Sequence, residues 1–470
     1  MASSLSLSPT LSLGRPIDRK LFAGISNYPI VGKLMVGSCS SAQYFRYRLN
    51  SAFYSKAMRT LAEPILSPSP TQNPSSSSSS PWLMLPPAFD VDVSGAASRS
   101  YKFYSIADNN IVTLSTGKSS KEREELTWSP MWVTGSSHGW LALLCPRSRN
   151  LFLYNPISRR QINLPSLGDL PSYPPTNYPR AFKVILTCSP DGPNSRAVMI
   201  YNNIRGLAFC CPGFGKEWIR IGDHHWFDEN KGEAFSRGYK DCVYSTRHEA
   251  LFSLTKHSGV LETWDLRDPQ SPRAMKMVRV SKKVGIFCYQ RRTRKDERRT
   301  RKVEKKLRRT STPVEHLVVA GQDLLVVTQY VVGRFDFDGL YVDTADPYAF
   351  AYERGLPCVT VDFDVHKYDP EDGEFKYVEG SSLGGWALFV GFFSDAVALP
   401  AAEFPELKPN SIYFTDAMED VLIDNFKTGG HDIGIFNYVD KTVFPCYFPC
   451  DVKNMRKSFP APMWFFPSRE

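Results

Sequence analysis

Short segments that end on an aromatic residue followed by a turn recur along this chain, and this repeat constrains the fold more than any other feature. The segments are LFLYNP, GLAFCCP, VLETWDL, DVHKYDP and GIFNYVD. Their aromatic residues are Tyr154, Phe209, Trp264, Tyr368 and Phe436, and the first two intervals are both 55 residues long. The third interval has 104 residues and contains a strongly basic run, and the fourth has 68. A recurring unit of this size predicts a fold built from repeated strand units.

Within one such interval the chain reads as four consecutive strands. FKVILTC, RAVMIY, IRGLAFCC and KEWIRIG span residues 182–222 and are separated by turn residues. A four-stranded antiparallel sheet cannot bury both of its faces alone, so such units must stack, and radial stacking gives a β-propeller. We therefore predict an all-β fold, a β-propeller of five or six four-stranded blades that starts near Trp82. A large β-sandwich is the alternative, which the repeated unit favours less.

The first 81 residues differ in composition from the rest. Residues 1–62 carry eight basic residues and one acid, and they are rich in Ser and Leu, as organellar transit peptides are. We expect a mitochondrial address, with the chloroplast as the alternative, or else a disordered tail without function. Residues 63–81 form a linker, because 13 of the 18 residues from position 64 onward are Ser or Pro. The predicted propeller then occupies residues 82–470.

The formal net charge of +9 comes from one run, residues 291–309, which has 12 basic residues and three acids. We place it in an insertion at about 281–313 of an otherwise balanced chain. The run lacks Phe, Tyr and Trp, so it offers no stacking platform for reading single-stranded bases. We favour a solvated loop for this run; nonspecific contact with RNA or another anionic surface is the functional alternative, and a nuclear-localisation signal is a third. The candidate contact residues are Arg291, Arg292, Arg294, Lys295, Arg298, Arg299, Arg301, Lys302, Lys305, Lys306, Arg308 and Arg309.

Four short motifs invite a chemical interpretation, and in each case a turn or loop explains the residues better. Gly135–Gly139 fits the G-x-S-x-G pattern of a nucleophile elbow, but an apolar strand follows it where an elbow requires a helix. Gly213–Gly215 indicates a hairpin turn, and His224–His225 a loop pair. Asp369–Glu374 lacks the alternating register of a calcium loop and indicates a solvated hairpin turn. Four acids in strand or turn contexts give no assignable carboxylate pair: Asp336, Asp338, Asp362 and Asp364.

These interpretations predict no catalytic residue, no cofactor and no metal site. The ten cysteines show no paired C-x-x-C spacing, so we expect free thiols in a reducing compartment. No stretch of eighteen uncharged apolar residues is present, so we expect no membrane span. We also expect a monomer.

Several segments together resemble a known family. SPWLMLPP, YKFYSIADNN, GSSHGWLALL, LFLYNPISRRQINLP, HDIGIFNYVD and PMWFFPS are similar to the plant domain-of-unknown-function 295 family, the KIB-type propellers related to the kelch-like propellers of F-box proteins. The resemblance covers about residues 82–470 and implies no catalytic residues. Many members carry an N-terminal F-box, whereas in this chain a transit-like leader and a linker precede the propeller. The chain therefore resembles the organellar branch that lacks the F-box.

The sequence thus leads to one preferred function and two alternatives. The preferred function is a non-catalytic protein-interaction propeller in an organelle, whose partner the sequence does not identify. The first alternative is an organellar factor that associates nonspecifically with RNA or anionic surfaces through residues 291–309. The second is an F-box-type substrate adaptor that has lost its F-box.

Overall fold

The regular secondary structure of the described residues consists of 27 β-strands and one 3₁₀ turn, Ala401–Glu403. In this part of the chain no helix is long and apolar enough to cross a membrane. Six of the ten cysteines lie among the described residues, and all six are free thiols. The computed structural model describes residues 80–91, 97–115, 131–145, 148–167, 170, 181–192, 194–201, 206–222, 225–228, 233–236, 238–256, 259–268, 270–279, 311–332, 359–379, 382–417, 432–444, 446 and 461–468.

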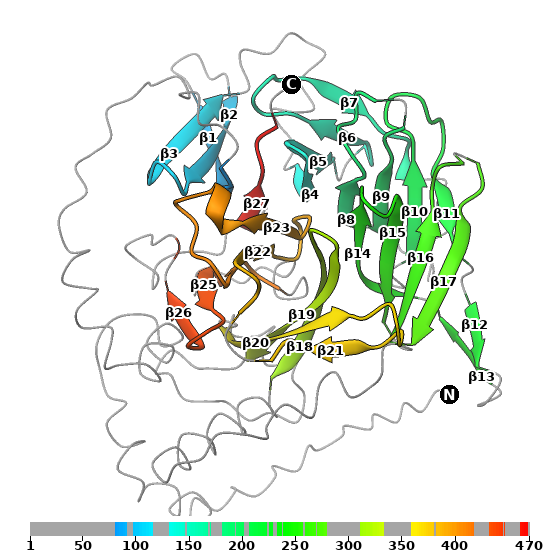
Figure 1. The fold of residues 1–470 in the computed structure, drawn as a ribbon. Coiled ribbons are helices and arrows are strands. Elements are labelled where there is room, and N and C mark those ends of the chain that lie inside the picture. Colours follow the sequence, from blue (N-terminus) through cyan, green and yellow to red (C-terminus); the bar gives the residue numbers. More distant parts are fainter. Residues whose placement is uncertain are drawn as a thin grey trace, which may run out of the picture.

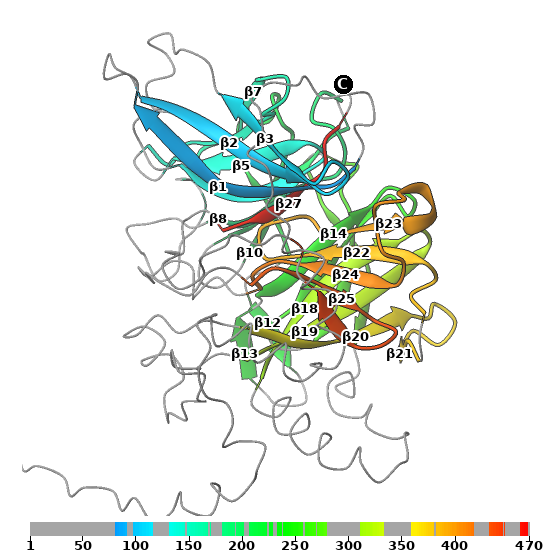
Figure 2. The same ribbon diagram turned by 90° about the vertical axis from the view of Figure 1, so that its left-hand side faces the viewer.

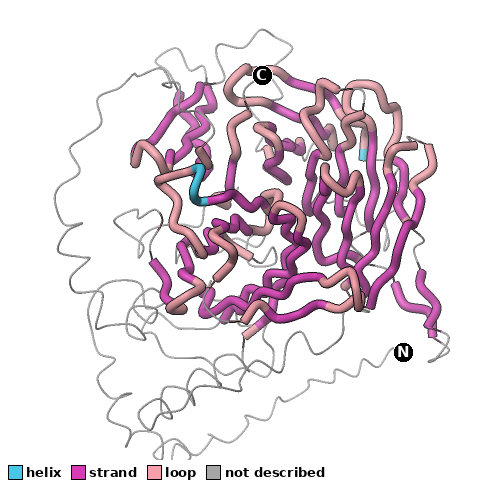
Figure 3. Tube along the Cα trace, viewed as in Figure 1, coloured by secondary structure: helices cyan, strands magenta, loops and turns pink. Residues whose placement is uncertain are grey.

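The strands form six blades arranged in a ring, which Figure 1 shows end-on and Figure 2 from the side. Figure 3 shows how little of the ring is anything other than strand and connecting loop. Four blades are separate four-stranded sheets, and the other two share a nine-stranded sheet. This arrangement confirms the propeller and gives the larger of the two predicted blade numbers.

Blades 1 to 3 follow in order around the ring, and the strands of each are named from the innermost outward. Blade 1 comprises β27 (Met463–Phe465), β1 (Trp82–Val91), β2 (Ala97–Ser105) and β3 (Asn110–Ser115). Blade 2 comprises β4 (Trp132–Ser137), β5 (Trp140–Leu144), β6 (Leu151–Tyr154) and β7 (Gln161–Asn163). Blade 3 comprises β8 (Ala181–Leu186), β9 (Ala197–Tyr201), β10 (Gly206–Cys210) and β11 (Ile219–Ile221).

A two-stranded hairpin, β12 (His225–Asp228) and β13 (Glu233–Ser236), precedes blade 4. Blade 4 comprises β14 (Tyr239–Ser245), β15 (Ala250–Thr255), β16 (Val260–Asp265) and β17 (Arg273–Arg279). Blade 5 comprises β18 (Thr312–Ala320), β19 (Asp323–Val332), β20 (Val359–Tyr368) and β21 (Phe375–Tyr377). Blade 6 comprises β23 (Val397–Pro400), β22 (Trp386–Val390), β24 (Ser411–Phe414), β25 (Gly434–Asn437) and β26 (Thr442–Phe444).

Blade 6 departs from the predicted four-stranded unit. Its extra strand β23 turns back antiparallel to β22 and also pairs in parallel with β18 at Val319 and Val397, which joins blades 5 and 6 into one sheet. Because β23 lies between β22 and β24 in the sequence, β22 and β24 run parallel to each other. The four-strand unit therefore holds in five blades, and the sixth has five strands.

The aromatic repeat has a structural meaning, because all five markers lie on the next-to-outermost strand of their blade. These strands are β6, β10, β16, β20 and β25. The equivalent strand of blade 1 is β2, which carries Tyr104 near its end. The four strands predicted over residues 182–222 correspond to β8 to β11, which confirms the repeat unit.

The long third interval has two causes rather than one. The connection from β17 to β18 contains the basic run, but β18 already begins at Thr312, so the end predicted for the insertion falls inside a strand. Residues 333–358, between β19 and β20, also lengthen the interval. Residues 291–309, with all twelve candidate contact residues, lie outside the described part of the chain.

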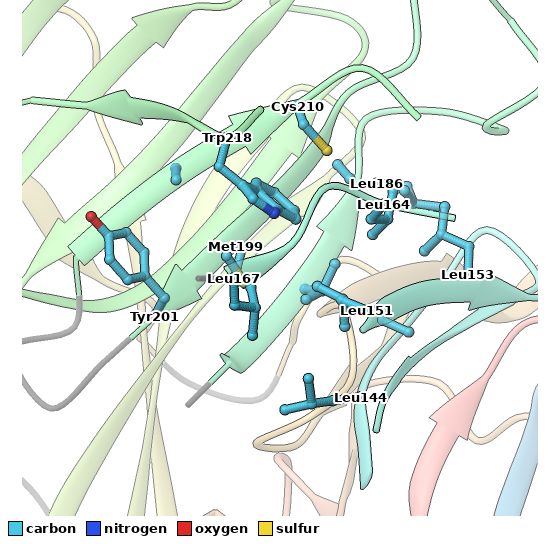
Figure 4. Close-up of a cluster of buried hydrophobic side chains, with 14 of the residues drawn as sticks. Leu144, Leu151, Leu153, Leu164, Leu167, Leu186, Met199, Tyr201, Cys210 and Trp218 are labelled. Carbon is cyan, nitrogen blue, oxygen red and sulfur yellow. The ribbon is translucent and has the colours of Figure 1, made fainter. Parts of the chain in front are cut away.

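Six apolar clusters hold the ring together, one at each contact between neighbouring blades. The alternation of side chains along a strand explains this arrangement. On β5, Leu141 and Leu143 pack toward blade 1, whereas Ala142 and Leu144 pack toward blade 3. Figure 4 shows the cluster between blades 2 and 3, where Leu151 and Leu153 meet Leu186. Strands buried on both faces need apolar residues at consecutive positions, and this is why the sequence shows runs such as WLALL.

The ring closes through the chain ends, because β27 supplies the innermost strand of blade 1. It pairs with β1 through Trp82 and Phe465, Leu83 and Trp464, and Met84 and Met463. The buried Trp464 ring then packs edge-on against Phe389 of blade 6.

Candidate binding groove between blades 4 and 5

Charged side chains are buried where the innermost strands meet at the axis of the ring. Lys183 on β8 and Asp241 on β14 form an ion pair with a Nζ–Oδ1 distance of 2.5 Å, and both side chains are about 95% buried. The backbone N–H of Leu317 on β18 donates to Asp241 Oδ2 at 2.8 Å. One carboxylate thus joins the innermost strands of blades 3, 4 and 5. Burial disfavours the charged Lys183, but the carboxylates of Asp241 and Asp395 outweigh it, so the pKa of Lys183 is raised.

The segment between β22 and β23 crosses from blade 6 to blade 2. Ser136 N donates to the Phe393 carbonyl at 3.1 Å, and Asp395 N donates to the Ser136 carbonyl at 2.9 Å. This crossing places the Asp395 carboxylate beside Ser137, whose hydroxyl donates to Asp395 Oδ2 at 3.0 Å. Burial raises the pKa of Asp395. The segment therefore links blade 6 to blade 2, and its carboxylate is held by Ser137 within that contact.

The G-x-S-x-G motif contributes to this contact and not to a nucleophile elbow. Ser137 Oγ also accepts a hydrogen bond from Leu186 N at 3.1 Å, so it links blades 2 and 3. His138 and Gly139 have φ of 50° and 78°, the conformation of a two-residue hairpin turn, and β5 follows at once. The tight turn was predicted, although Gly135 to Ser137 belong to β4 and only His138 and Gly139 form the turn.

A second polar chain runs from His316 through blades 5 and 6. The His316 Nε2 and Gln329 Oε1 atoms are 3.0 Å apart, and Gln329 Nε2 donates to Thr360 Oγ1 at 2.7 Å. Because Gln329 donates onward, its oxygen accepts from His316, which fixes the proton on Nε2 of the neutral ring. Thr360 in turn donates to Asp432 at 2.6 Å. Burial lowers the pKa of His316. These groups tie blade 5 to blade 6.

A groove of about 1030 Å³ lies between blades 4 and 5. Its floor is apolar and continues the cluster between the two blades, with Phe252, Leu261 and Leu324 among its residues. Its rim carries charged and amphipathic side chains from β17, β20 and the β20–β21 turn, with Lys276, Tyr368 and Glu371 among them.

The groove exists because the outer strands of the two blades differ in length. Strand β17 has seven residues and β21 has three, so blade 5 covers only part of the blade 4 face that points toward it. The exposed β17 includes Met275, which is 56% exposed and is one of few large apolar side chains on the described surface to be so accessible. An apolar floor with an exposed methionine at its margin is the kind of surface that a protein partner covers.

Two of the three groove lysines are paired with carboxylates of blade 5 itself. Lys367 Nζ lies 2.8 Å from Asp323 Oδ2, and Lys376 bridges Asp369 and Asp372. Lys276 Nζ instead donates to the Tyr368 hydroxyl at 3.0 Å and lies 5.7 Å from the centre of that ring. Among the described residues Lys276 has no carboxylate partner.

The acid-rich segment at 369–374 is the hairpin turn that was predicted. Asp369 N donates to the Glu374 carbonyl at 2.9 Å, and Gly373 has the positive φ of 74° that such a turn requires. Hydrogen bonds from Lys376 are the largest cause that lowers the pKa values of Asp369 and Asp372, so Lys376 neutralises the acidic turn.

The other predicted positions have these outcomes. Gly213–Gly215 lies in the hairpin turn between β10 and β11, as predicted. Asp362 and Asp364 lie on β20, where Tyr330 donates to Asp364 at 2.8 Å. His224, Asp336 and Asp338 lie outside the described residues. The loop prediction is wrong for His225, which begins β12 and pairs with Ser236 of β13. Within the described part of the chain no three His, Cys, Asp or Glu side chains are grouped to hold a metal ion.

Sequence reasoning missed the residues that matter most in both regions. Lys183 interrupts the otherwise apolar stretch FKVIL, and Asp241 lies within the mostly buried strand YKDCVYS; a charge in a buried strand is a signal for a buried partner. Met275 and Lys276 carried no such signal, because their importance depends on the length of a strand in the next blade.

The fold and its buried axis define a β-propeller, and a comparison with known families specifies which one. The KIB1-4 β-propeller pattern matches residues 103–437, and the chain belongs to this family. No curated protein is similar enough to the chain to count as a match.

The similarity to solved structures is remote in both sequence and structure. Apo AztD from Citrobacter koseri is 12% identical with a TM-score of 0.30, and the matched region covers 67% of this chain and 75% of the AztD chain. The Cps50 (Swd1) β-propeller domain of Myceliophteria thermophila is 8% identical with a TM-score of 0.32, and the match covers 81% of this chain and 96% of that domain. The periplasmic gluconolactonase PpgL of Pseudomonas aeruginosa is 13% identical with a TM-score of 0.29, and the match covers 64% of this chain and 66% of the PpgL chain. Scores this low carry no argument about function.

Proposed function

We propose that this chain is a non-catalytic protein-interaction propeller that works in an organelle and binds its partner at the groove between blades 4 and 5. Membership of the KIB1-4 propeller family supports an interaction domain in general. The observation that carries the specific proposal is the groove itself, with its apolar floor and the exposed Met275. Burial of such a floor by a partner is favourable at about 25 cal/mol per Å² of apolar surface.

The buried polar groups of the ring support the same proposal, because none of them is exposed to a substrate. Lys183, Asp241, His316 and Ser137 all have partners within the ring and are almost completely buried. A catalytic group must reach its substrate, and these groups are used to join blades. The accessible surface chemistry of the described residues is therefore that of binding.

The experiment compares two variants that each replace an exposed apolar side chain by aspartate. Met275→Asp changes the groove, whereas Phe214→Asp changes the β10–β11 turn of blade 3, where Phe214 is 73% exposed. In proximity labelling with the full-length chain, we expect Met275→Asp to lose a group of labelled proteins that the parent and Phe214→Asp both retain. Equal loss in both variants, or in neither, would show that the groove is not the site.

The organellar address rests on the composition of residues 1–62. A fluorescent protein fused to the C-terminal end of the full chain should report mitochondria, or plastids under the alternative. Removal of residues 1–62 should abolish that pattern. A diffuse or nuclear signal from the full chain would contradict the proposal, and a nuclear signal would favour the basic run as the address.

The charge of residues 291–309 favours a second candidate function, nonspecific association with RNA or another polyanion. Because β18 begins at Thr312, a deletion of residues 281–310 removes the run and leaves the strand intact. If this function holds, the deletion lowers retention on RNA and reduces the steepness of its salt dependence. Unchanged retention would exclude it. The third possibility, an adaptor that has lost its F-box, predicts a ubiquitin-ligase subunit among the labelled proteins.

A further inference from the structure

We infer that the groove takes an extended segment of a partner protein, which adds as a strand to β17 and carries an acidic residue two positions from an aliphatic one. The inference rests on the proposed function and specifies the chemistry of the partner. Three observations support it: the outer edge of β17, the side chains that face the groove, and their charge.

Strand β17 presents an open edge. Among the described residues it pairs with β16 alone, and its seven residues make it the longest outermost strand of the six blades. An outermost strand has a row of backbone N–H and C=O groups without a neighbouring strand, and an extended peptide can pair with that row. Strands β7, β11, β21 and β26 have only three residues each and offer much shorter edges.

Two rows of side chains lie across blade 4 on the face toward the groove. Phe252, Thr263 and Lys276 form one row, and Leu254, Leu261 and Val278 form the next. Lys276 and Val278 are the outermost members of these rows, and both line the groove. An added strand would extend each row by one residue, and these two residues would be two positions apart in the partner because a strand has a period of two.

The ends of the rows specify the residues that fit. The row that ends at Val278 is apolar and continues into the groove floor, so it selects an aliphatic side chain. The row that ends at Lys276 selects a carboxylate, because a lysine ammonium has three donors and the Tyr368 hydroxyl takes one. The exposed Arg273 adds positive charge to the same strand. A partner segment with an aliphatic residue two positions from Asp or Glu satisfies both rows.

The same charges argue against a second copy of this chain as the occupant. Two β17 strands paired edge to edge would bring together basic residues from both copies, with no acid in either strand to offset them. Like charges opposite each other destabilise strand pairing. Basic side chains on an outer strand therefore discourage self-association and admit an acidic partner.

The test selects random displayed peptides of about eight residues, a length that spans β17, against the full-length protein. We expect the enriched peptides to carry Asp or Glu two positions from Val, Ile or Leu. Lys276→Glu should weaken their binding by about tenfold or more, whereas Lys216→Glu should change it by less than about twofold. Lys216 is exposed on the β10–β11 turn of blade 3, so it provides the same charge reversal outside the groove. Thermal unfolding of both variants checks that neither change unfolds the ring.

Amide hydrogen exchange identifies the mode of binding. Addition of a strand should slow exchange in residues 273–279 when the selected peptide is bound, because their outer N–H groups gain partners. Peptides that depend on Lys276 without this protection would overturn strand addition and leave the groove as the binding site. No enrichment, enrichment of basic peptides, or equal binding to Lys276→Glu would overturn the inference as a whole. A failure of the proposed function is recognised separately, when Met275→Asp retains every labelled protein.

Discussion

The axis of the ring and the groove between blades 4 and 5 both contain charged side chains, but they use them in opposite ways. At the axis, Asp241 is buried and shared by the innermost strands of three blades. In the groove, lysines lie at the surface, and Lys276 has only a tyrosine hydroxyl as its partner among the described residues. The difference indicates that the axis holds the blades together and that the groove remains available for a partner. It also predicts that variants in the two regions change different properties.

The largest effect is expected from removing the shared carboxylate at the axis. Asp241→Ala removes the hydrogen-bonded counter-ion of the buried Lys183 ammonium, on which the Asp395 carboxylate still acts, and leaves Leu317 N without an acceptor. The loss of one partner of a buried ion pair costs about 3–5 kcal/mol of unfolding free energy. Urea denaturation measures this cost, and a loss below about 1 kcal/mol, typical of a surface pair, would contradict the comparison. Replacing both partners, as in Lys183→Met with Asp241→Leu, should recover most of the stability.

A smaller effect is expected from pH. Burial lowers the pKa values of His316 and His366 from the ordinary value of 6.5. The unfolded chain therefore takes up protons first as the pH falls below 6.5, so stability is unchanged by these groups above that value and is lost below it. The effect is at most about 1.4 kcal/mol per pH unit for each histidine. The charges that act on His316 are those of Asp241 and Lys183, beside its hydrogen bond to Gln329.

The measurement is the denaturation midpoint as a function of pH for the parent and for His316→Asn. Below pH 6.5 the midpoint of the variant should depend less on pH than that of the parent, and the pH dependence that remains should come from His366. If both proteins show the same slope, His316 is already protonated in the folded state, and the neutral hydrogen-bond chain through Gln329 is wrong.

The smallest effect on stability is expected in the groove. Met275→Asp alters an exposed side chain with no buried partner, so the unfolding free energy should change by no more than about 0.5 kcal/mol. The same variant should lose its partner. Circular dichroism during thermal unfolding checks the first statement, and a large drop in midpoint would mean that Met275 contributes to the packing of the ring.

The repeat made the ring predictable from sequence, because each blade must bury both faces and therefore carries consecutive apolar residues. Blade 3 was predicted strand by strand, and five aromatic markers fell at equivalent positions. The contacts at the axis were not predictable in this way. Lys183 and Asp241 are 58 positions apart, and Leu317 is 76 positions beyond Asp241, so only the closed ring brings them together.

Blade 6 and the groove show a second limit. Strand β23 has four residues, and a strand this short has too little periodicity to be recognised beside β22. The groove depends on β17 being longer than β21, a relation between two blades that no single stretch of sequence expresses. The basic run was conspicuous in the sequence, yet it lies outside the described residues, whereas the inconspicuous RAMKMVR forms the open edge.

Photo-crosslinking tests the central claim, that the groove between blades 4 and 5 is the partner site, most directly. A photoreactive phenylalanine analogue is placed at position 275 of the full chain or, as the control, at position 214, and the cells are irradiated. We predict a discrete crosslinked protein from position 275 that is absent from position 214 and is lost when Lys276→Glu is added. The same crosslinked proteins from both positions, or a product from position 275 that survives Lys276→Glu and Val278→Asp together, would contradict it.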